Sequence, residues 1–193
     1  MRLILTRHGE TEENVKSIIQ GDRIGGKLTH LGMEQAKKLA QRLKDEKFDH
    51  IYSSDLSRAA DTAKIIAKYH PDVPLDFVLE LREMGMGNKT GTVGNKDDNK
   101  NLFNLAPDAE SFKSMQSRTK KLIELAYSKH PNGSVLFVGH GQINKAILSV
   151  IENKPASSIP DHNVMSNTAI SIFEVREDKK HVIHLLNCTK HLG

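Results

Sequence analysis

Two apolar runs in the sequence each end in a histidine beside glycine. The stretch LILTRHG begins at Leu3, and the stretch SVLFVGHG begins at Ser134. Continuous apolar runs are typical of strands in the middle of a parallel sheet, and the carboxyl ends of parallel strands lie at one edge of that sheet. We therefore expect His8 and His140 to meet at the same edge.

A third stretch brings an arginine to this edge. The segment His50–Ser53 is a short strand candidate, and the following SDLSR places Arg58 in the first turn of the next helix. Arg7 supplies a second guanidinium group. A phosphate monoester carries nearly two negative charges at neutral pH, and guanidinium groups bind its oxygens bidentately without losing their charge. Two arginines and two histidines at one edge predict a site for phosphoryl transfer.

The two histidines suit different roles. His8 is the better nucleophile, because Gly9 follows it and lets the chain turn sharply while phosphate approaches the backbone amides. A neutral imidazole can attack phosphorus when a hydrogen bond holds its other nitrogen. His140 would then donate a hydrogen bond to the developing charge. A short helix over 11–15, capped by Thr11, would aim further amide groups at the anion.

A departing alkoxide needs a proton, so the reaction requires a general acid near the same edge. Glu83 ends the segment LELRE, just before a long stretch without periodicity. We assign Glu83 as the proton donor, and Glu80 is the competing assignment. The sequence shows no carboxylate cluster with metal-ligand spacing. We therefore expect a reaction that needs neither a metal ion nor a cofactor.

Other interpretations of these residues carry less weight. His140 between two glycines is compatible with a simple turn, and Arg58 with a surface pair to Asp55 or Asp61. The GHGQIN stretch also resembles a dinucleotide-binding loop. It lacks the last glycine of that motif, however, and a histidine occupies the position of the tight turn. The single cysteine, Cys188, can form no internal disulfide.

Composition restricts the partners. The net charge of +4 is compatible with weak nucleic-acid affinity or with a small anionic substrate. Lysines are spread over predicted helices among acidic residues, and tryptophan is absent. This pattern favours a small phosphorylated metabolite over nucleic acid. No apolar run approaches a membrane span or a signal peptide, so we expect a cytoplasmic protein without membrane association.

Strands alternate with helices along the chain. This order predicts a three-layer α/β/α sandwich with a mostly parallel central sheet and an antiparallel edge strand. The expected strands are 3–5, 50–53 and 134–138, an extended segment 74–78, and a hairpin formed by 168–175 and 181–186. The expected helices are 29–46, a segment capped by Ser54 or Asp55 that ends before Pro71, 112–129, and about ten residues after Gly141.

The length of 193 residues fits a single domain over 1–193. Residues 84–110 contain a long stretch without periodicity, with GNKDDNKN in its middle. Such a segment is typical of disorder or of a functional lid. We predict a lid insertion that selects the substrate.

Several motifs follow one another over almost the whole chain: RHGET with Asn14, Gln20-Gly21, Leu28-Thr29 with Gly32 and Gln35, SSDLSRA, LRE with Gly87 and Gly91, Glu110-Ser111 with Arg118, VGHG, and Asn187 with His191. Each motif alone is weak evidence for a protein family, but the whole set in this order is highly specific. The set resembles the histidine phosphatase superfamily, the phosphoglycerate mutase-like proteins, and within it the phosphatase branch.

The resemblance implies that His8 becomes phosphorylated, that Arg7, Arg58 and His140 complete the phosphate pocket, and that Glu83 is the proton donor. It also implies a set of residues close to the substrate: Asn14, Gln20, Gly21, Gly141 and the amide of Gln142. The chain departs from the family pattern at Lys89-Thr90 and at Asp108-Ala109. Both departures fall in the predicted lid, so they concern specificity more than mechanism.

Three functions compete. The first is a phosphatase that hydrolyses a small phosphomonoester. The second is a phosphoglycerate mutase, which returns the phosphate to a bound intermediate. Relatives with mutase activity are usually longer, and this sequence stops soon after His191, which favours hydrolysis. The third is a non-catalytic phosphate-binding regulatory domain, against which the intact set of five catalytic residues argues. The physiological substrate stays open, and a homodimer is compatible with the sequence.

Overall fold

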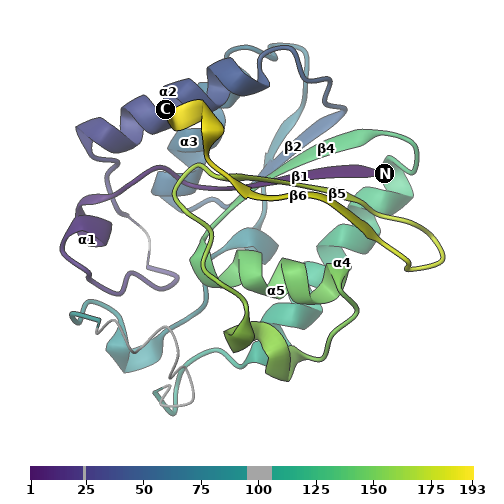
Figure 1. Ribbon diagram of the computed structural model, residues 1–193. Helices are drawn as coiled ribbons and strands as arrows, with labels where there is room; N and C mark the ends of the chain where they lie inside the picture. The colour runs from purple at the N-terminus through teal and green to yellow at the C-terminus, as the bar shows by residue number, and fades with distance from the viewer. Residues whose placement is uncertain (24, 95–105) are drawn as a thin grey trace.

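A mixed β-sheet runs through the middle of the molecule (Figure 1). The computed structural model describes residues 1–23, 25–94 and 106–193. Within these residues the sheet has six strands in the order β3-β2-β4-β1-β5-β6. Their bounds are β1 Arg2–Arg7, β2 His50–Ser53, β3 Leu75–Phe77, β4 Ser134–Gly139, β5 Ile170–Glu174 and β6 Val182–Cys188.

The strands β3, β2, β4 and β1 run parallel, and β5 and β6 complete the other side of the sheet in antiparallel pairings. The predicted fold class is confirmed, and β5 and β6 form the expected hairpin at one edge of the sheet. The register places Arg7 opposite Gly139. The residues that follow β1 and β4 therefore leave the sheet at the same edge, and His8 and His140 leave with them.

Helices cover both faces of the sheet, which gives three layers (Figure 1). The helices α2 and α3 lie on one face, and α4 and α5 lie on the other. The bounds of the α-helices are α1 Glu12–Val15, α2 His30–Leu43, α3 Ser57–Ala67, α4 Phe112–Lys129 and α5 Gly141–Ile151. Short 3₁₀ helices are η1 Leu79–Leu81, η2 Gly87–Lys89, η5 Ala156–Asp161 and η6 Lys190–Leu192.

Alternating side chains of β1 build two cores. Leu3 and Leu5 pack with α4 and α5, whereas Ile4 packs with α2 and α3. All three are fully buried. Successive side chains of a strand point to opposite faces, so a continuous apolar run is what a strand covered on both faces requires. This packing fixes the position of the strand end that carries Arg7 and His8.

One predicted helix start was wrong. Thr29 caps α2 by accepting a hydrogen bond from the Gly32 amide, as expected for its residue type. The helix α3, however, begins after Leu56 without a side-chain cap. The Asp55 carboxylate is instead bound by Arg82, whose Nε donates to Asp55 Oδ1 at 2.7 Å. A charged hydrogen bond to a distant arginine outweighs the local cap.

The predicted lid at 84–110 is described only at its two ends, because residues 95–105 lie outside the described part of the chain. At the first end, Val93 forms an isolated bridge with Ile18, and Met84 is buried. In the ranges that the structure describes, no helix combines the length and the apolar character needed to cross a membrane.

Candidate active site

A pocket of about 340 Å³ opens where β1 and β4 end. Nine of the ten predicted site residues line it: Arg7, His8, Asn14, Gln20, Gly21, Arg58, Glu83, Gly141 and Gln142. The tenth, His140, is buried directly behind this wall, with its ring centroid 5.1 Å from that of His8. The structure thus brings together residues that lie as far as 135 positions apart in the sequence, as between Arg7 and Gln142.

His8 is held as a neutral imidazole with one free nitrogen. Its Nδ1 lies 2.7 Å from the carbonyl oxygen of Gly9, which can only accept, so Nδ1 carries the proton. Burial lowers the pKa of His8 well below its ordinary value, and the charges of Arg7 and Arg58 lower it further. The unprotonated Nε2 is therefore the nitrogen available for attack.

His140 is held in the opposite tautomer. Arg58 Nε donates to His140 Nδ1 at 3.1 Å. A guanidinium group has no acceptor, so the proton of His140 lies on Nε2. This Nε2 is buried and has no hydrogen-bond partner among the described residues. Burial, followed by the charge of Arg58, lowers the pKa of His140 well below its ordinary value. The ring is neutral, and its Nε2–H is free to donate a hydrogen bond to an acceptor.

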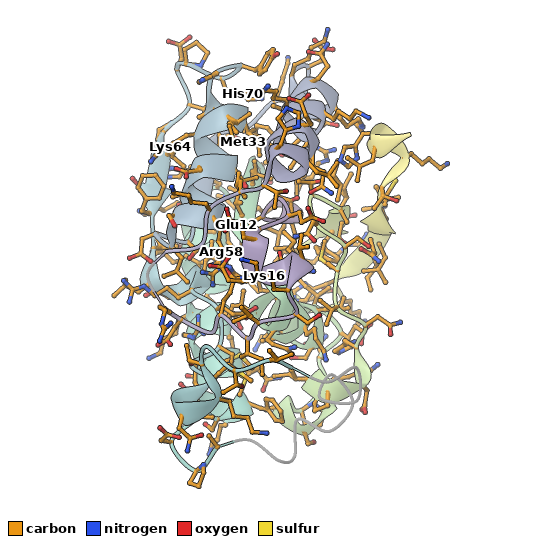
Figure 2. The ribbon with its side chains drawn as sticks, turned by 90° about the vertical axis from the view of Figure 1, so that its left-hand side faces the viewer. Glu12, Lys16, Met33, Arg58, Lys64 and His70 are labelled. Carbon is orange, nitrogen blue, oxygen red and sulfur yellow. The ribbon has the colours of Figure 1, made fainter. Side chains whose placement is uncertain are left out.

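The two arginines carry positive charge into the interior. Arg58 is 1 % exposed and lies in the first turn of α3, where Figure 2 labels it. Its Nη2 donates to the Gly21 carbonyl at 2.7 Å, and Arg7 Nη1 donates to the Met165 carbonyl at 2.9 Å. Burial lowers the pKa of both side chains. Neither forms an ion pair with a described carboxylate, so an anion in the pocket would supply the missing charge.

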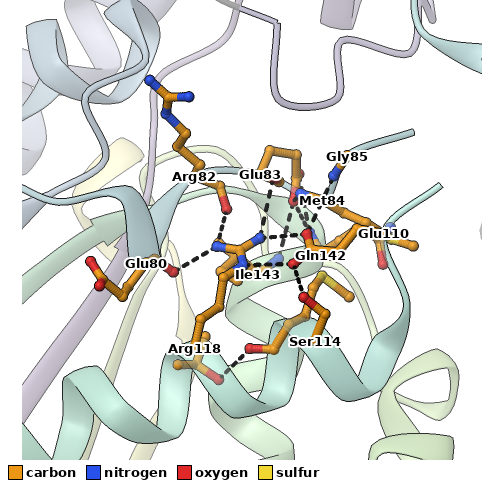
Figure 3. Close-up of polar contacts among 12 residues, drawn as sticks. Glu80, Arg82, Glu83, Met84, Gly85, Glu110, Ser114, Arg118, Gln142 and Ile143 are labelled. Carbon is orange, nitrogen blue, oxygen red and sulfur yellow. Dashed lines mark hydrogen bonds and ion pairs between the residues drawn. The ribbon is translucent and has the colours of Figure 1, made fainter. Parts of the chain in front are cut away.

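Glu83 lies in the segment after η1, and its carboxyl group faces the start of α5. Its Oε1 accepts from the amides of Met84 at 2.9 Å, Gln142 at 3.0 Å and Ile143 at 3.1 Å (Figure 3). These amides fix the position of the carboxyl group. The Gln142 amide, which the resemblance places near the substrate, is thus engaged by Glu83. The competing Glu80 is not among the pocket-lining residues of the described chain.

Arg118 holds the segment that carries Glu83. Its guanidinium forms two hydrogen bonds with the Glu110 carboxylate, each 2.8 Å long (Figure 3). Its Nη1 donates to the carbonyls of Glu80 and Arg82, both at 2.7 Å, and its Nη2 reaches the carbonyl of Glu83 at 3.3 Å. From the sequence alone Arg118 was only part of a motif. The carbonyls that it binds could not be deduced from residue types.

A second unpredicted residue supports His8. Asn167 Nδ2 donates to the carbonyl oxygen of His8 at 2.9 Å and to Asn14 Oδ1 at 3.3 Å. Asn14 in turn closes a capping box with Thr11 at the start of α1. An asparagine in a loop before β5 carries no sequence signal for this role. Its contribution depends on the pairing of β5 with β1.

Two predicted backbone roles differ in the structure. A Cβ on Gly9 would lie 2.5 Å from the carbonyl oxygen of Gly32, and the Gly9 amide donates to Thr62 Oγ1 at 3.1 Å. Glycine is therefore required for the close approach to the start of α2, and its amide is not free for phosphate. The amide of Glu12 in α1 is likewise paired, with the Lys27 carbonyl at 3.3 Å.

Gly141 keeps space in the pocket. A Cβ at this position would lie 3.1 Å from Val164 Cγ1 and 3.5 Å from Glu83 Oε2. It would also lie 4.0 Å from Arg7 Nε. A side chain here would enter the gap between the carboxyl group and the guanidinium. Glycine at this position leaves that gap open.

These residues together define a class of site. Two buried guanidinium groups, an imidazole acceptor and an imidazole donor suit a phosphoryl group that is transferred to nitrogen. In the described parts of the chain, no group of three or more histidine, cysteine, aspartate or glutamate side chains is placed to hold a metal ion. The arrangement is chemically able to transfer a phosphoryl group to a histidine nitrogen.

Comparison with known proteins gives the family. Residues 3–189 match the model of the histidine phosphatase superfamily (branch 1). The chain belongs to this superfamily, and the resemblance seen in its motifs is confirmed. The match covers nearly the whole chain, from β1 to the residue before η6.

Relatives and solved structures agree with this assignment. A metal-independent phosphoserine phosphatase of Arabidopsis thaliana is 31% identical, over 99% of this chain and 83% of its own length. The structure of Bacillus stearothermophilus YhfR superposes with a TM-score of 0.88 at 26% identity, over 100% of this chain and 99% of the other. A phosphoserine phosphatase mutant from Entamoeba histolytica, solved with phosphoserine, gives 0.84 at 29% identity, over 99% and 98%.

Proposed function

We propose that the protein is a metal-independent phosphatase that hydrolyses a small phosphomonoester through a phosphohistidine on His8, with Glu83 as proton donor. Membership of the histidine phosphatase superfamily and relatives named as phosphatases support the reaction class. The observation that carries the residue roles is the pair of opposite tautomers: Nε2 of the pocket-lining His8 is unprotonated, whereas Nε2 of His140, buried behind the pocket wall next to His8, carries the proton.

The first half of the reaction transfers the phosphoryl group to the enzyme. His8 Nε2 attacks phosphorus, the N–P bond forms, and the P–O bond to the alcohol breaks. Protonated Glu83 gives its proton to the departing oxygen. Arg7, Arg58 and His140 Nε2–H bind the phosphoryl oxygens throughout, so the developing charge meets donors that are already in place.

The second half regenerates the enzyme. Glu83, now a carboxylate, takes a proton from water as that water attacks phosphorus. The N–P bond breaks, inorganic phosphate leaves, and Glu83 is again protonated. Because one carboxyl group serves as acid and then as base, its geometry at the start of α5 matters in both steps.

Phosphate release from a panel of sugar phosphates, bisphosphates, phosphoglycerates and p-nitrophenyl phosphate tests the proposal. We expect turnover that persists in EDTA and is lost in His8→Ala. No turnover of any substrate by the wild type would overturn the phosphatase assignment. Activity that survives in His8→Ala would remove His8 as nucleophile, and loss in EDTA would refute metal independence.

The role of Glu83 needs a separate comparison. An alkyl phosphate has a poor leaving group that needs protonation, whereas p-nitrophenolate leaves readily without it. We expect Glu83→Gln to impair turnover of the alkyl ester far more than turnover of p-nitrophenyl phosphate. Equal impairment of the two substrates would argue against general acid catalysis by this residue.

The setting of the enzyme is also a proposal. The composition favours a small phosphorylated metabolite as substrate and a cytoplasmic location, and relatives are named for phosphoserine. Cell fractionation tests the location. Light scattering after size exclusion decides between a monomer and a homodimer.

A further inference from the structure

One carboxylate in the pocket wall has no role in the reaction as proposed. Glu13, on the single turn α1, lines the pocket together with Asn14 and Gln20. Its Oε2 is buried and accepts no hydrogen bond from any described residue. A buried carboxylate oxygen without a hydrogen-bond donor is energetically unfavourable. A ligand that donates a hydrogen bond to this oxygen would therefore be bound favourably.

Further unpaired acceptors belong to residues that line the same pocket. Gln20 Oε1 and Gln142 Oε1 are also buried without a partner in the described structure. Both residues line the pocket with Glu13. By contrast, the unpaired donors, Arg7 Nε and His140 Nε2, belong to the phosphate end. The pocket residues and the adjoining His140 therefore include unpaired donors, which suit an anion, and unpaired acceptors, which suit a donor group on the rest of the substrate.

The negative charge of Glu13 restricts which hydrogen-bond donor would bind there. Burial lowers the pKa of Arg58, and the charges of Glu83 and Glu13 oppose that effect, which places Glu13 within electrostatic reach of the phosphate end. Arg23 lines a small adjoining recess with Glu13, yet the two form no ion pair in the described structure. A carboxylate repels a second anionic group on the substrate and attracts a cation.

We propose that Glu13 selects phosphomonoesters whose alcohol half carries a protonated amine, which Glu13 binds while the phosphate lies between Arg7 and Arg58. The inference rests on the proposed phosphatase function and adds the chemical class of the leaving alcohol. The acceptor oxygens of Gln20 and Gln142 would take the remaining ammonium protons, since an ammonium group has three donors and no acceptor.

The test uses a two-carbon series that differs only at the far end: O-phosphoethanolamine with an ammonium, propyl phosphate with a methyl, 2-hydroxyethyl phosphate with a hydroxyl, and phosphoglycolate with a carboxylate. The quantity is kcat/KM for phosphate release, with propyl phosphate as the reference. We expect the wild type to prefer O-phosphoethanolamine by about tenfold, as for a hydrogen bond to a charged group. Phosphoglycolate should be the poorest substrate.

Two variants separate the role of Glu13 from a general charge effect. In Glu13→Gln, which keeps the size of the side chain, the ratio for O-phosphoethanolamine should fall to near one and phosphoglycolate should gain. Glu12→Gln is the matched control: this neighbour is exposed, pairs with Lys16 and does not line the pocket. It should keep the ratios of the wild type. Thermal unfolding of each variant confirms that it folds.

The outcomes distinguish this inference from the function on which it rests. Turnover of all four esters at similar rates, or a preference for the hydroxyl or the carboxylate, would overturn the ammonium proposal and leave the phosphatase intact. An unchanged preference in Glu13→Gln would remove Glu13 as its source. If the wild type releases phosphate from none of the four esters and not from p-nitrophenyl phosphate, the phosphatase function fails and the inference fails with it.

Discussion

At the residue scale, the chemistry depends on which nitrogen of each histidine carries the proton. The Gly9 carbonyl and the Arg58 guanidinium set the two tautomers, because one can only accept and the other can only donate. Arg58 thus has two tasks: it adds charge to the pocket and it orients His140. Lysine would keep the charge and lose the second task.

Arg58→Lys tests this double role. We expect the variant to fold and to lose about 100-fold in kcat/KM for p-nitrophenyl phosphate, the size seen when one donor to a developing charge is removed. Arg42→Lys, on the surface of α2 beside Glu46, is the control and should behave as the wild type. Steady-state kinetics and circular dichroism decide the matter. Wild-type turnover in Arg58→Lys would show that charge alone suffices.

At the element scale, segments distant in sequence are held together by contacts of the backbone. Arg118 on α4 binds three carbonyls of the segment that ends in Glu83. The start of α2 packs so closely on the segment after β1 that neither Gly9 nor Gly32 can carry a Cβ without a clash below 3.0 Å. Both contacts position residues of the site and do not themselves involve the substrate.

Arg118→Lys should displace Glu83 and so impair protonation of the leaving group. We expect kcat for an alkyl phosphate to fall by at least about tenfold, with a smaller loss for p-nitrophenyl phosphate. Lys121→Gln, exposed on the same helix, is the control. A purely structural role would lower the unfolding temperature and both activities together, and that result would contradict the positioning role.

Gly9→Ala distinguishes packing from phosphate access. Because the added methyl would lie 2.5 Å from a backbone carbonyl, we expect a loss of roughly 1–3 kcal/mol in the free energy of unfolding, measured by urea denaturation. Thr11→Ser, which keeps the hydroxyl group that caps α1, is the control for a conservative substitution close to Gly9. A stable but inactive Gly9→Ala protein would favour the role of Gly9 in phosphate access.

At the scale of the whole molecule, burying a cationic site costs free energy. The packing of the two apolar cores on either side of the sheet offsets that cost. His8 and His140 stay neutral in the folded protein because burial lowers the pKa of each. In the unfolded chain their pKa returns to about 6.5. The unfolded state therefore binds more protons as pH falls below that value, and folding stability must fall with it.

We expect the free energy of unfolding to fall by about 1 kcal/mol between pH 6.5 and 5.5 for each histidine that stays neutral in the fold. The contribution is complete above pH 6.5 and is lost toward the lowered pKa of the folded state. His8→Gln removes one such group and should reduce the slope by that amount. Urea denaturation across this range provides the measurement, and equal slopes in both proteins would contradict it.

Much of the molecule could be predicted before the fold was known. Apolar runs bounded by polar residues located the central strands, since β1 and β4 are covered on both faces and admit few polar side chains. Strand ends then placed Arg7, His8 and His140 at one edge. Local patterns failed where a distant partner competed, as when Arg82 took Asp55 from the expected cap of α3.

The sequence by itself determined the layers, the order of the catalytic motifs and the residue types at the phosphate end, because these depend on hydrophobic periodicity and on chemistry local to each strand end. Only the tertiary structure decided the tautomers, the support of Glu83 by Arg118, and the unpaired oxygen of Glu13. Each of these depends on hydrogen bonds between atoms far apart in the chain. Their distances and directions exist only after the sheet has formed.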